Sequence, residues 1–233
     1  MFRFKQFSIQ QDRCAMKVGT DGVLLGAWAD CRNARRILDI GTGTGLIALM
    51  LAQRCPAVID AVEIDKNAAE QALENVQRSP WAERVRIINA SFQDFCKTAT
   101  TRYDLVVSNP PYFHRSLKSP TIERSFARHS DTLPFDEIIE GSKKLLSEKG
   151  KLTVILPLIE SVAFTEKALS AGFFCGKKCL LTPRPGAETK RVLLSFGKEN
   201  QACQHSELLI ETATRHCYSE QYRELTKDFY LGF

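Results

Sequence analysis

Short apolar runs alternate with amphipathic segments along the first two thirds of the chain. The runs are rich in aliphatic and β-branched residues and have the length of strands; they lie at 37–40, 58–62, 85–88, 105–107 and 152–156. Helical spacing of apolar residues occurs between them at 46–53 and 68–76, and in a stripe of Phe135, Ile138, Ile139, Leu145 and Leu146 that Gly150 closes. This alternation predicts a parallel sheet covered by helices on both faces.

The pattern changes after a helix that we expect to end near Gly172. Residues 173–181 and 191–196 are both strand-like, and only a loop containing proline and glycine joins them. Because this loop is too short for a helical crossover, the two strands should pair antiparallel. The predicted fold class is therefore α/β: a doubly wound, mostly parallel seven-stranded sheet with an antiparallel C-terminal hairpin.

The N-terminal residues precede this sheet. Apolar and polar residues alternate from Phe2 to Ile9, which predicts a strand or hairpin. Thr20, whose side chain can cap free backbone amides, should begin a short helix that runs to Trp28.

The tail of the chain continues the pattern without a linker. A strand is expected at 207–210, followed by an aromatic-ended helix from about Ser219. We therefore predict a single domain, 1–233, in which residues 1–30 form an N-terminal extension and 206–233 a strand–helix tail packed on the core.

Composition and charge narrow the class of protein. The 233 residues include 32 Lys+Arg and 27 Asp+Glu, for a net charge of +5, and 44% are hydrophobic, which is typical of a globular chain. The longest run without a charge, 40–53, is shorter than the about 20 residues that span a bilayer. The N-terminus also lacks the apolar core of a signal peptide. These features predict a cytoplasmic protein without a membrane segment.

The eight cysteines are scattered and contain no Cys-x-x-Cys pair, so we expect reduced thiols. Cys203 with His205, and His216 with Cys217, are spaced unlike any structural zinc motif. We predict no metal site.

A glycine-rich turn follows the first strand of the predicted sheet and precedes a helix. Its glycines, Gly41, Gly43 and Gly45, would let a ligand approach the backbone at the carboxyl end of the strand. The turn lacks the Lys-Ser/Thr ending of a P-loop, and Leu46 stands where a dinucleotide fingerprint requires glycine. The turn is either a tight structural turn or a site for a nucleoside-bearing ligand without a pyrophosphate.

Two further strand ends carry polar groups. Glu63 ends the second strand, where a carboxylate can accept hydrogen bonds from both hydroxyls of a ribose; the alternative is a surface acid. Asp65 is expected to cap the next helix.

Asn109 and the two prolines after it follow another strand. Prolines fix the backbone and remove donors, so this bend is either an ordinary proline turn or a cluster of acceptors that grips a planar amino group.

These motifs resemble those of the class I S-adenosylmethionine-dependent methyltransferases, in which Asn-Pro-Pro-Tyr marks methylation of an amino nitrogen conjugated to a ring or carbonyl. The resemblance covers nearly the whole chain. Residues 14–28, 79–84 and 218–231 are similar, more narrowly, to the bacterial enzymes that methylate N6 of adenine 37 in the anticodon loop of tRNA1(Val). The resemblance implies S-adenosyl-L-methionine as cofactor, a tRNA substrate and no obligatory protein partner.

The resemblance also implies roles for individual residues. Catalytic roles fall to Asn109, Pro110 and Tyr112. The cofactor-binding residues would be Lys17, Thr20, Asp39, Gly41, Gly43, Gly45, Glu63, Ser91, Phe92 and Asn109. Ser91 departs from the family, which usually carries an aspartate there to meet the adenine of the cofactor; Asp94 follows three residues later. Which group reads the adenine edge is therefore open.

Two segments are enriched in Lys and Arg, 114–129 and 177–191. They are either solvated loops or a footprint for a polyanion. With a tRNA substrate, the phosphate-binding residues would be Arg115, Lys118, Arg124, Arg128, Arg184 and Lys190.

Other functions share parts of this pattern. Asn-Pro-Pro-Tyr also serves methyltransferases that act on a guanine N2 amine of rRNA or on a protein glutamine amide, although only 36 residues precede Ile37, too few for the N-terminal substrate domain of the glutamine enzymes. A cofactor-binding RNA module without turnover and a nicotinamide dehydrogenase are the alternatives from other classes. Leu46 disfavours the dehydrogenase.

Overall fold

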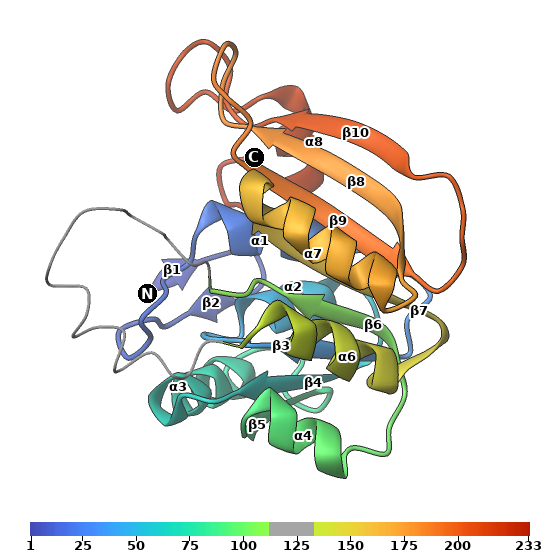
Figure 1. Cartoon of the computed structure of the whole chain (residues 1–233). Coiled ribbons are helices and arrows are strands. Elements are labelled where there is room, and N and C mark those ends of the chain that lie inside the picture. Colours follow the sequence, from blue (N-terminus) through green and yellow to red (C-terminus); the bar gives the residue numbers. More distant parts are fainter. Residues whose placement is uncertain (112–132) are drawn as a thin grey trace, which may run out of the picture.

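The computed structural model describes residues 1–111 and 133–233. Within these ranges the core is one eight-stranded sheet of order β10-β8-β9-β7-β6-β3-β4-β5 (Figure 1). Its strands are β3 (Arg36–Ile40), β4 (Val58–Glu63), β5 (Val85–Asn89), β6 (Tyr103–Ser108), β7 (Leu146–Pro157), β8 (Phe174–Thr182), β9 (Arg191–Gly197) and β10 (Gln204–Leu209).

The directions of the strands confirm the predicted fold class. Strands β5, β4, β3, β6 and β7 pair parallel in that order, and β9 runs antiparallel to both β7 and β8. The sheet has one strand more than the seven expected, because the tail strand β10 pairs parallel with the outer edge of β8.

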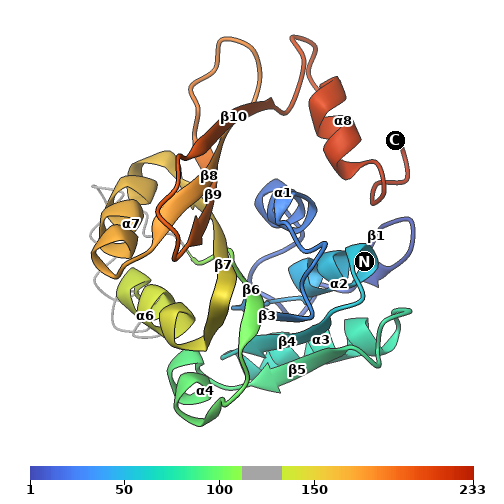
Figure 2. The ribbon, with the colours of Figure 1, turned by 90° about the vertical axis from the view of Figure 1, so that its right-hand side faces the viewer.

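Helices cover both faces of the sheet (Figure 2). They are α1 (Thr20–Trp28), α2 (Leu46–Arg54), α3 (Lys66–Gln77), α4 (Phe92–Thr98), α6 (Phe135–Leu145), α7 (Leu158–Ser170) and α8 (Glu220–Thr226). Alternate residues of a strand point to opposite faces, so in β3 Ile37 joins the core beneath α1, α2 and α8, and Leu38 joins the core beneath α4, α6 and α7. Burial on both faces explains why these strands read as continuous apolar runs.

Local signals at helix ends were confirmed in part. The side chain of Asp65 accepts a hydrogen bond from the Ala68 amide at 2.7 Å, as expected of the α3 cap. The helix predicted from Thr20 to Trp28 is confirmed as α1, but the expected capping role of Thr20 was wrong, because Gly19 holds the cap position without a side-chain hydrogen bond. Helix α4, which the sequence analysis did not predict, begins at a Ser91 cap.

The junction of α6 and β7 also differs from expectation. The helix ends at Leu145 and the strand begins at once at Leu146, so Gly150 lies inside β7 and closes no helix. A Cβ at Gly150 would lie 2.7 Å from the carbonyl oxygen of Tyr103, which makes glycine necessary where the two backbones come close. Leu146, the last residue of the predicted helical stripe, pairs with Tyr103 of β6 and so belongs to the strand instead of the helix.

The two ends of the chain meet beside α1. The predicted N-terminal hairpin is present as β1 (Phe2–Arg3) and β2 (Ser8–Ile9). The ammonium of Lys5 donates to the carbonyl oxygens of Lys227 and Phe233, at 2.6 and 2.8 Å. In the tail, the helix expected from about Ser219 is present as α8, with Ser219 as its cap, and Tyr222 is 1% exposed within the core.

No helix in residues 1–111 and 133–233 is long and apolar enough to cross a lipid bilayer. In the same ranges, no group of three His, Cys, Asp or Glu side chains is placed to hold a metal ion.

Candidate active site

A cavity of about 940 Å³ lies at the carboxyl ends of the central strands. From β3 the chain goes to β4 and β5 on one side and returns to β6 on the other, so the cavity occupies the point where the strand order reverses. Parallel α/β sheets bind small molecules at this position, and the volume suits a ligand of nucleotide size. Its lining includes the glycine turn, the ends of β4 and β6, the residues after β5, and residues between 13 and 22.

The glycine turn is fixed by main-chain bonds to β4. The amides of Gly41 and Thr42 donate to the carbonyl oxygen of Val62 at 2.9 and 3.1 Å. Gly41 and Gly43 have φ angles of 70° and 57°, and a Cβ at either position would meet no atom within 4 Å. Both glycines line the cavity, so a ligand can lie directly against this backbone.

Gly45 belongs to the same motif but faces elsewhere. It does not line the cavity, and a Cβ on it would lie 3.5 Å from the Cβ of Ala72 on α3. With a φ of 81°, it starts α2 in a left-handed conformation close to α3. Its position indicates helix packing rather than ligand contact.

Glu63 stands at the end of β4 beside this turn and is 9% exposed. Its Oε2 accepts from the Gly43 amide at 2.8 Å, and its Oε1 accepts from the Asp65 amide at 2.9 Å. A carboxylate has about four acceptor sites, so both oxygens retain capacity for ligand hydroxyls. These two hydrogen bonds from backbone amides hold the carboxylate in place at the cavity wall.

Asp39 lies beneath the turn, fully buried, and does not line the cavity. Its Oδ2 accepts from the hydroxyl of Thr42 at 2.6 Å. Burial raises the pKa of this carboxyl to about 7, although the Thr42 hydroxyl and the Ala48 amide favour its charged form. Its geometry supports the glycine turn from below.

The end of β6 faces the glycine turn across the cavity. The hydroxyl of Ser108 donates to the carbonyl oxygen of Ile40 at 3.0 Å, which ties β6 to β3 at the point where both strands end. Asn109, Pro110 and Pro111 all line the cavity; Pro110 is buried and Asn109 half-buried. The proline bend therefore points into the same space as the glycine turn.

Ser91, Phe92 and Asp94 line the cavity beyond β5. The Ser91 hydroxyl donates to Oδ2 of Asp94 at 2.8 Å, and Lys97 donates to Oδ1 of the same carboxylate at 2.8 Å. Both hydrogen bonds lower the pKa of Asp94, and the one from Lys97 has the larger effect. A carboxylate is thus present at the edge where Ser91 replaces the usual aspartate.

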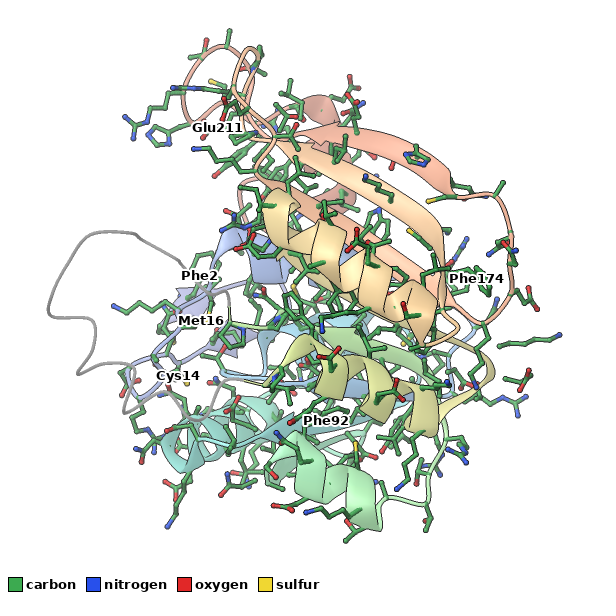
Figure 3. All side chains as sticks on the ribbon, viewed as in Figure 1. Phe2, Cys14, Met16, Phe92, Phe174 and Glu211 are labelled. Atoms are coloured by element: carbon green, nitrogen blue, oxygen red, sulfur yellow. The ribbon has the colours of Figure 1, made fainter. Side chains whose placement is uncertain are left out.

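Phe92 is buried between α4 and α6 (Figure 3). A Cβ on Gly141 of α6 would lie 2.4 Å from Cε1 of this ring, so the glycine makes room for it. The ring therefore packs directly against the backbone of α6.

Lys17 and Thr20 line the cavity from the N-terminal side. Cys14 and Met16, labelled in Figure 3, line it as well. Burial is the main cause that raises the pKa of the Cys14 thiol to about 11, and the charges of Glu63 and Asp65 add to it. Cys14 therefore stays a neutral thiol at physiological pH.

The remaining predicted residues lie away from the cavity or outside the described ranges. Arg184 and Lys190 are exposed in the β8–β9 connection and do not line the cavity. Tyr112, Arg115, Lys118, Arg124 and Arg128 lie outside the residues that the structure describes.

Gln71 and Asn75, two side chains of α3 for which no role was predicted, are each only 1% exposed. They interrupt the buried alanine face of the helix at a spacing of four residues. Amides at buried helical positions need hydrogen-bond partners, and this was the signal that could have singled them out.

Comparison with known proteins identifies the family. The family model described as Methyltransferase small domain matches residues 17–169, well over half of the chain. A protein of Bacteroides fragilis named tRNA1(Val) (adenine(37)-N6)-methyltransferase is 50% identical over 99% of this chain and 97% of its own length. A protein of the same name from Phocaeicola vulgatus is 51% identical over the same shares.

Solved structures agree on the fold. The crystal structure of a predicted O-methyltransferase from Agrobacterium tumefaciens superposes with a TM-score of 0.66 at 21% identity, covering 90% of this chain and 96% of that one. The names of the two curated relatives do not favour the alternative functions considered above: the dehydrogenase, the RNA module without turnover, and the guanine and glutamine enzymes. The chain belongs to the tRNA1(Val) (adenine(37)-N6)-methyltransferase family and contains the Methyltransferase small domain.

Proposed function

We propose that this enzyme transfers the methyl group of S-adenosyl-L-methionine to the exocyclic N6 amine of adenine 37 in the anticodon loop of tRNA1(Val), in the cytoplasm. The observation that carries the proposal is that one cavity unites the open glycine turn, the Glu63 carboxylate and the Asn109–Pro110 bend. Whole-length relatives with this activity in their names support the choice of substrate.

The residues of the cavity fit this cofactor. Gly41 and Gly43 offer backbone with free space in front of it, and Glu63 offers acceptors suited to the ribose hydroxyls. Lys17 and Thr20 would hold the methionine carboxylate on the opposite side.

The adenine of the cofactor would lie at the end of β5. Phe92 provides an apolar surface there, and Asp94, with Ser91 bonded to it, provides the acceptor for the adenine amino group. We assign this role to Asp94 and not to Ser91, because the Ser91 hydroxyl is already engaged as a donor to Asp94, whereas the carboxylate keeps further acceptor sites.

When bound, the cofactor supplies an electrophilic methyl group on positively charged sulfur. The N6 amine of adenine is a poor nucleophile because its lone pair is delocalised into the ring. The side-chain oxygen of Asn109 and the carbonyl oxygen of Pro110 would accept hydrogen bonds from its two N–H groups and localise that lone pair on nitrogen. The same two dipoles stabilise the positive charge that develops on nitrogen. Asn109 is no base, so the surplus proton leaves to solvent.

The substrate base must leave its stack to reach this bend. An unpaired loop base is easier to extract than a paired one, which favours an anticodon loop. Tyr112 would stack on the extruded base, which is worth about 1–3 kcal/mol.

Arg184 and Lys190 would contact phosphates without reading sequence, as would the four basic residues between 115 and 128. Replacing Arg184 and Lys190 together by glutamate should weaken tRNA binding about tenfold or more and reduce its salt dependence, in filter-binding assays over a salt series. The affinity for S-adenosylhomocysteine should stay unchanged. Equal loss of both affinities would indicate a folding defect instead.

The decisive experiment incubates the enzyme with tritiated cofactor and unmodified tRNA, followed by nucleoside analysis and mapping of the labelled position. We expect N6-methyladenosine at position 37 of tRNA1(Val). Label in N2-methylguanosine, or in protein, would overturn the proposal.

A further inference from the structure

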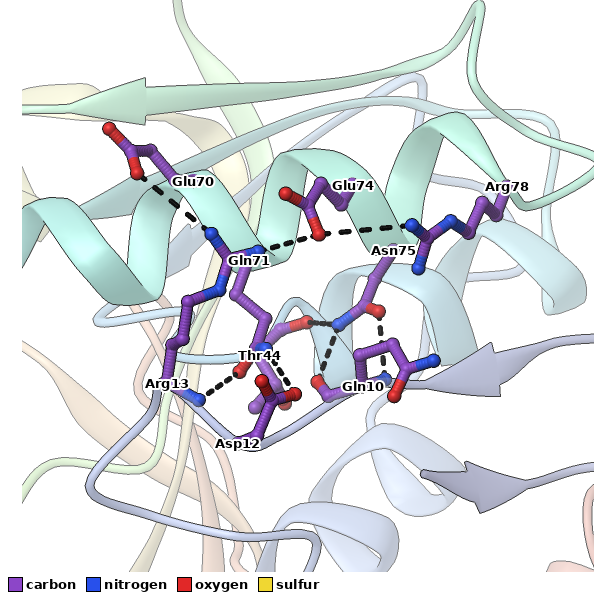
Figure 4. Close-up of polar contacts among 9 residues, drawn as sticks. All are labelled: Gln10, Asp12, Arg13, Thr44, Glu70, Gln71, Glu74, Asn75 and Arg78. Carbon is purple, nitrogen blue, oxygen red and sulfur yellow. Dashed lines mark hydrogen bonds and ion pairs between the residues drawn. The ribbon is translucent and has the colours of Figure 1, made fainter.

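Two buried amides on α3 hold the segment that forms the N-terminal wall of the cavity. We define residues 10–19 as the strap. Asn75 accepts from the backbone amide of Gln10 through Oδ1 at 2.8 Å and donates to the carbonyl oxygen of the same residue through Nδ2 at 2.9 Å (Figure 4). One side chain thus satisfies both main-chain groups of Gln10, as a neighbouring strand would.

Asn75 also reaches the glycine turn. Its Nδ2 donates a second hydrogen bond, to the carbonyl oxygen of Thr44 at 2.9 Å. Both N–H groups of the amide are therefore used, one on the strap and one on the turn. A single buried side chain sets the distance between two walls of the cavity.

Gln71, one helical turn earlier, holds the next part of the strap. Its Oε1 accepts from the Arg13 amide at 3.0 Å, and its Nε2 donates to Oδ1 of Asp12 at 2.8 Å. The guanidinium of Arg13 also pairs with Glu74 at 2.6 Å, but both side chains are more than a third exposed, and such pairs contribute little.

Elsewhere the strap is held by the buried Cys14 and by Val18, which packs on the core and whose amide donates to Oε1 of Gln11 at 2.7 Å. Ala15, Met16 and Lys17 line the cavity yet are exposed, so apolar burial does not fix them. Gln71 and Asn75 do not line the cavity themselves. Whatever they contribute to ligand binding must therefore act through the strap and the turn.

We propose that Gln71 and Asn75 are positioning residues for the cofactor: they fix the strap against the glycine turn, and without them the cavity binds its ligand weakly. The identity of the ligand rests on the proposed function, whereas the anchoring of the strap does not.

The first test needs no ligand. Trypsin cuts after Arg13 and Lys17, so cleavage at these two bonds in the ligand-free protein reports release of the strap. In Asn75→Leu, which keeps the branching at Cγ and removes the hydrogen bonds, we expect cleavage at both bonds to accelerate at least fivefold, measured by mass spectrometry. The matched control is Gln53→Leu, which removes an amide that donates to the carbonyl oxygen of Asp228 in the tail, at 2.8 Å, and should leave both bonds as in the wild type.

The second test removes the hydrogen bond between Gln71 and Asp12, and then restores it with donor and acceptor exchanged. Gln71→Glu keeps the acceptor for the Arg13 amide but places a carboxylate against Asp12. The dissociation constant for S-adenosylhomocysteine, measured by calorimetry, should rise about tenfold. Adding Asp12→Asn to Gln71→Glu restores a donor and an acceptor with reversed polarity, and should bring the constant back to within threefold of wild type. The kcat at saturating cofactor should change less than twofold in all of these variants.

Wild-type trypsin rates in a folded Asn75→Leu protein would overturn the inference, and so would a failure of Asp12→Asn to rescue Gln71→Glu. If Asn75→Leu does not fold, the Gln71 pair decides. A wild-type protein that binds no S-adenosylhomocysteine refutes the proposed function instead, and the trypsin rates then decide the inference alone.

Discussion

The cavity has two walls of different construction. The wall at the strand ends is held from within the sheet: the backbone amides of Gly41 and Thr42 donate to the carbonyl oxygen of Val62, and the Ser108 hydroxyl donates to that of Ile40. The wall formed by the strap is held from outside, by the side-chain amides of Gln71 and Asn75.

Because of this difference, substitutions in the two walls should have different consequences. The main-chain hydrogen bonds of the strand-end wall do not depend on which side chains are present, so we expect the backbone of this wall to tolerate most single substitutions, but not those that need another backbone conformation. The strap depends on a few side chains, so substitutions there should change affinity by degrees while the fold stays intact.

The largest effect is expected at Asn109 on the strand-end wall. Asn109→Ala removes a proposed acceptor for the amine and should lower kcat about 10²–10³-fold, with the affinity for S-adenosylhomocysteine preserved. Asn109→Asp, which keeps an oxygen at that position, should lose less. Single-turnover methylation of tRNA and calorimetry measure the two quantities, and normal turnover by the alanine variant would refute the acceptor mechanism.

A second prediction tests the backbone of the same wall. Gly43→Val places a branched side chain at a φ of 57° and into the cavity, so the affinity for S-adenosylhomocysteine should fall at least about 30-fold. Gly197→Val is the matched control, because Gly197 has no positive φ and a Cβ there meets nothing within 4 Å. A dissociation constant equal in the two variants would show that the glycine turn is only structural.

On the strap and at the first residue of α1, effects should be smaller. Lys17→Ala and Thr20→Ala should each weaken cofactor binding about three- to tenfold without changing the melting temperature, because both residues line the cavity and Lys17 is exposed. Calorimetric titration and thermal melting provide the comparison. Unchanged affinity in both variants would remove these residues from the carboxylate site.

The smallest effect on activity is expected at Asp39, where the strand-end wall should show a dependence on pH. Its pKa of about 7 in the folded protein exceeds the unfolded value of about 3.9, so the folded state binds more protons between these values. The free energy of unfolding should therefore fall as pH rises through this window, by on the order of 1–4 kcal/mol relative to Asp39→Asn. Denaturant titrations of both proteins from pH 4.5 to 8 measure the difference, and parallel curves would contradict it.

Most of the elements could be predicted from the sequence because their signals are local. The apolar runs locate the strands, and the antiparallel pairing of β8 with β9 follows from the short loop between them. Glu63 and the Asn109 bend could be assigned to one site because the carboxyl ends of parallel strands meet at the same edge.

The contacts that position the site required the tertiary structure. Ser91 departs from the family pattern, and only the fold brings Asp94 to the same edge of the cavity. Gly45 reads like the two glycines before it, yet it faces Ala72 of a later helix.

Hydrophobic periodicity by itself determined the α/β class and the order of its elements, since a strand or a helix shows its buried faces within a few residues. The anchoring of the strap was decided only in three dimensions. Gln10 and Asn75 are 65 residues apart, and Arg13 and Gln71 are 58 apart. A hydrogen bond between such residues leaves no periodic trace in the sequence, because it depends on how two separately specified elements come to lie against each other.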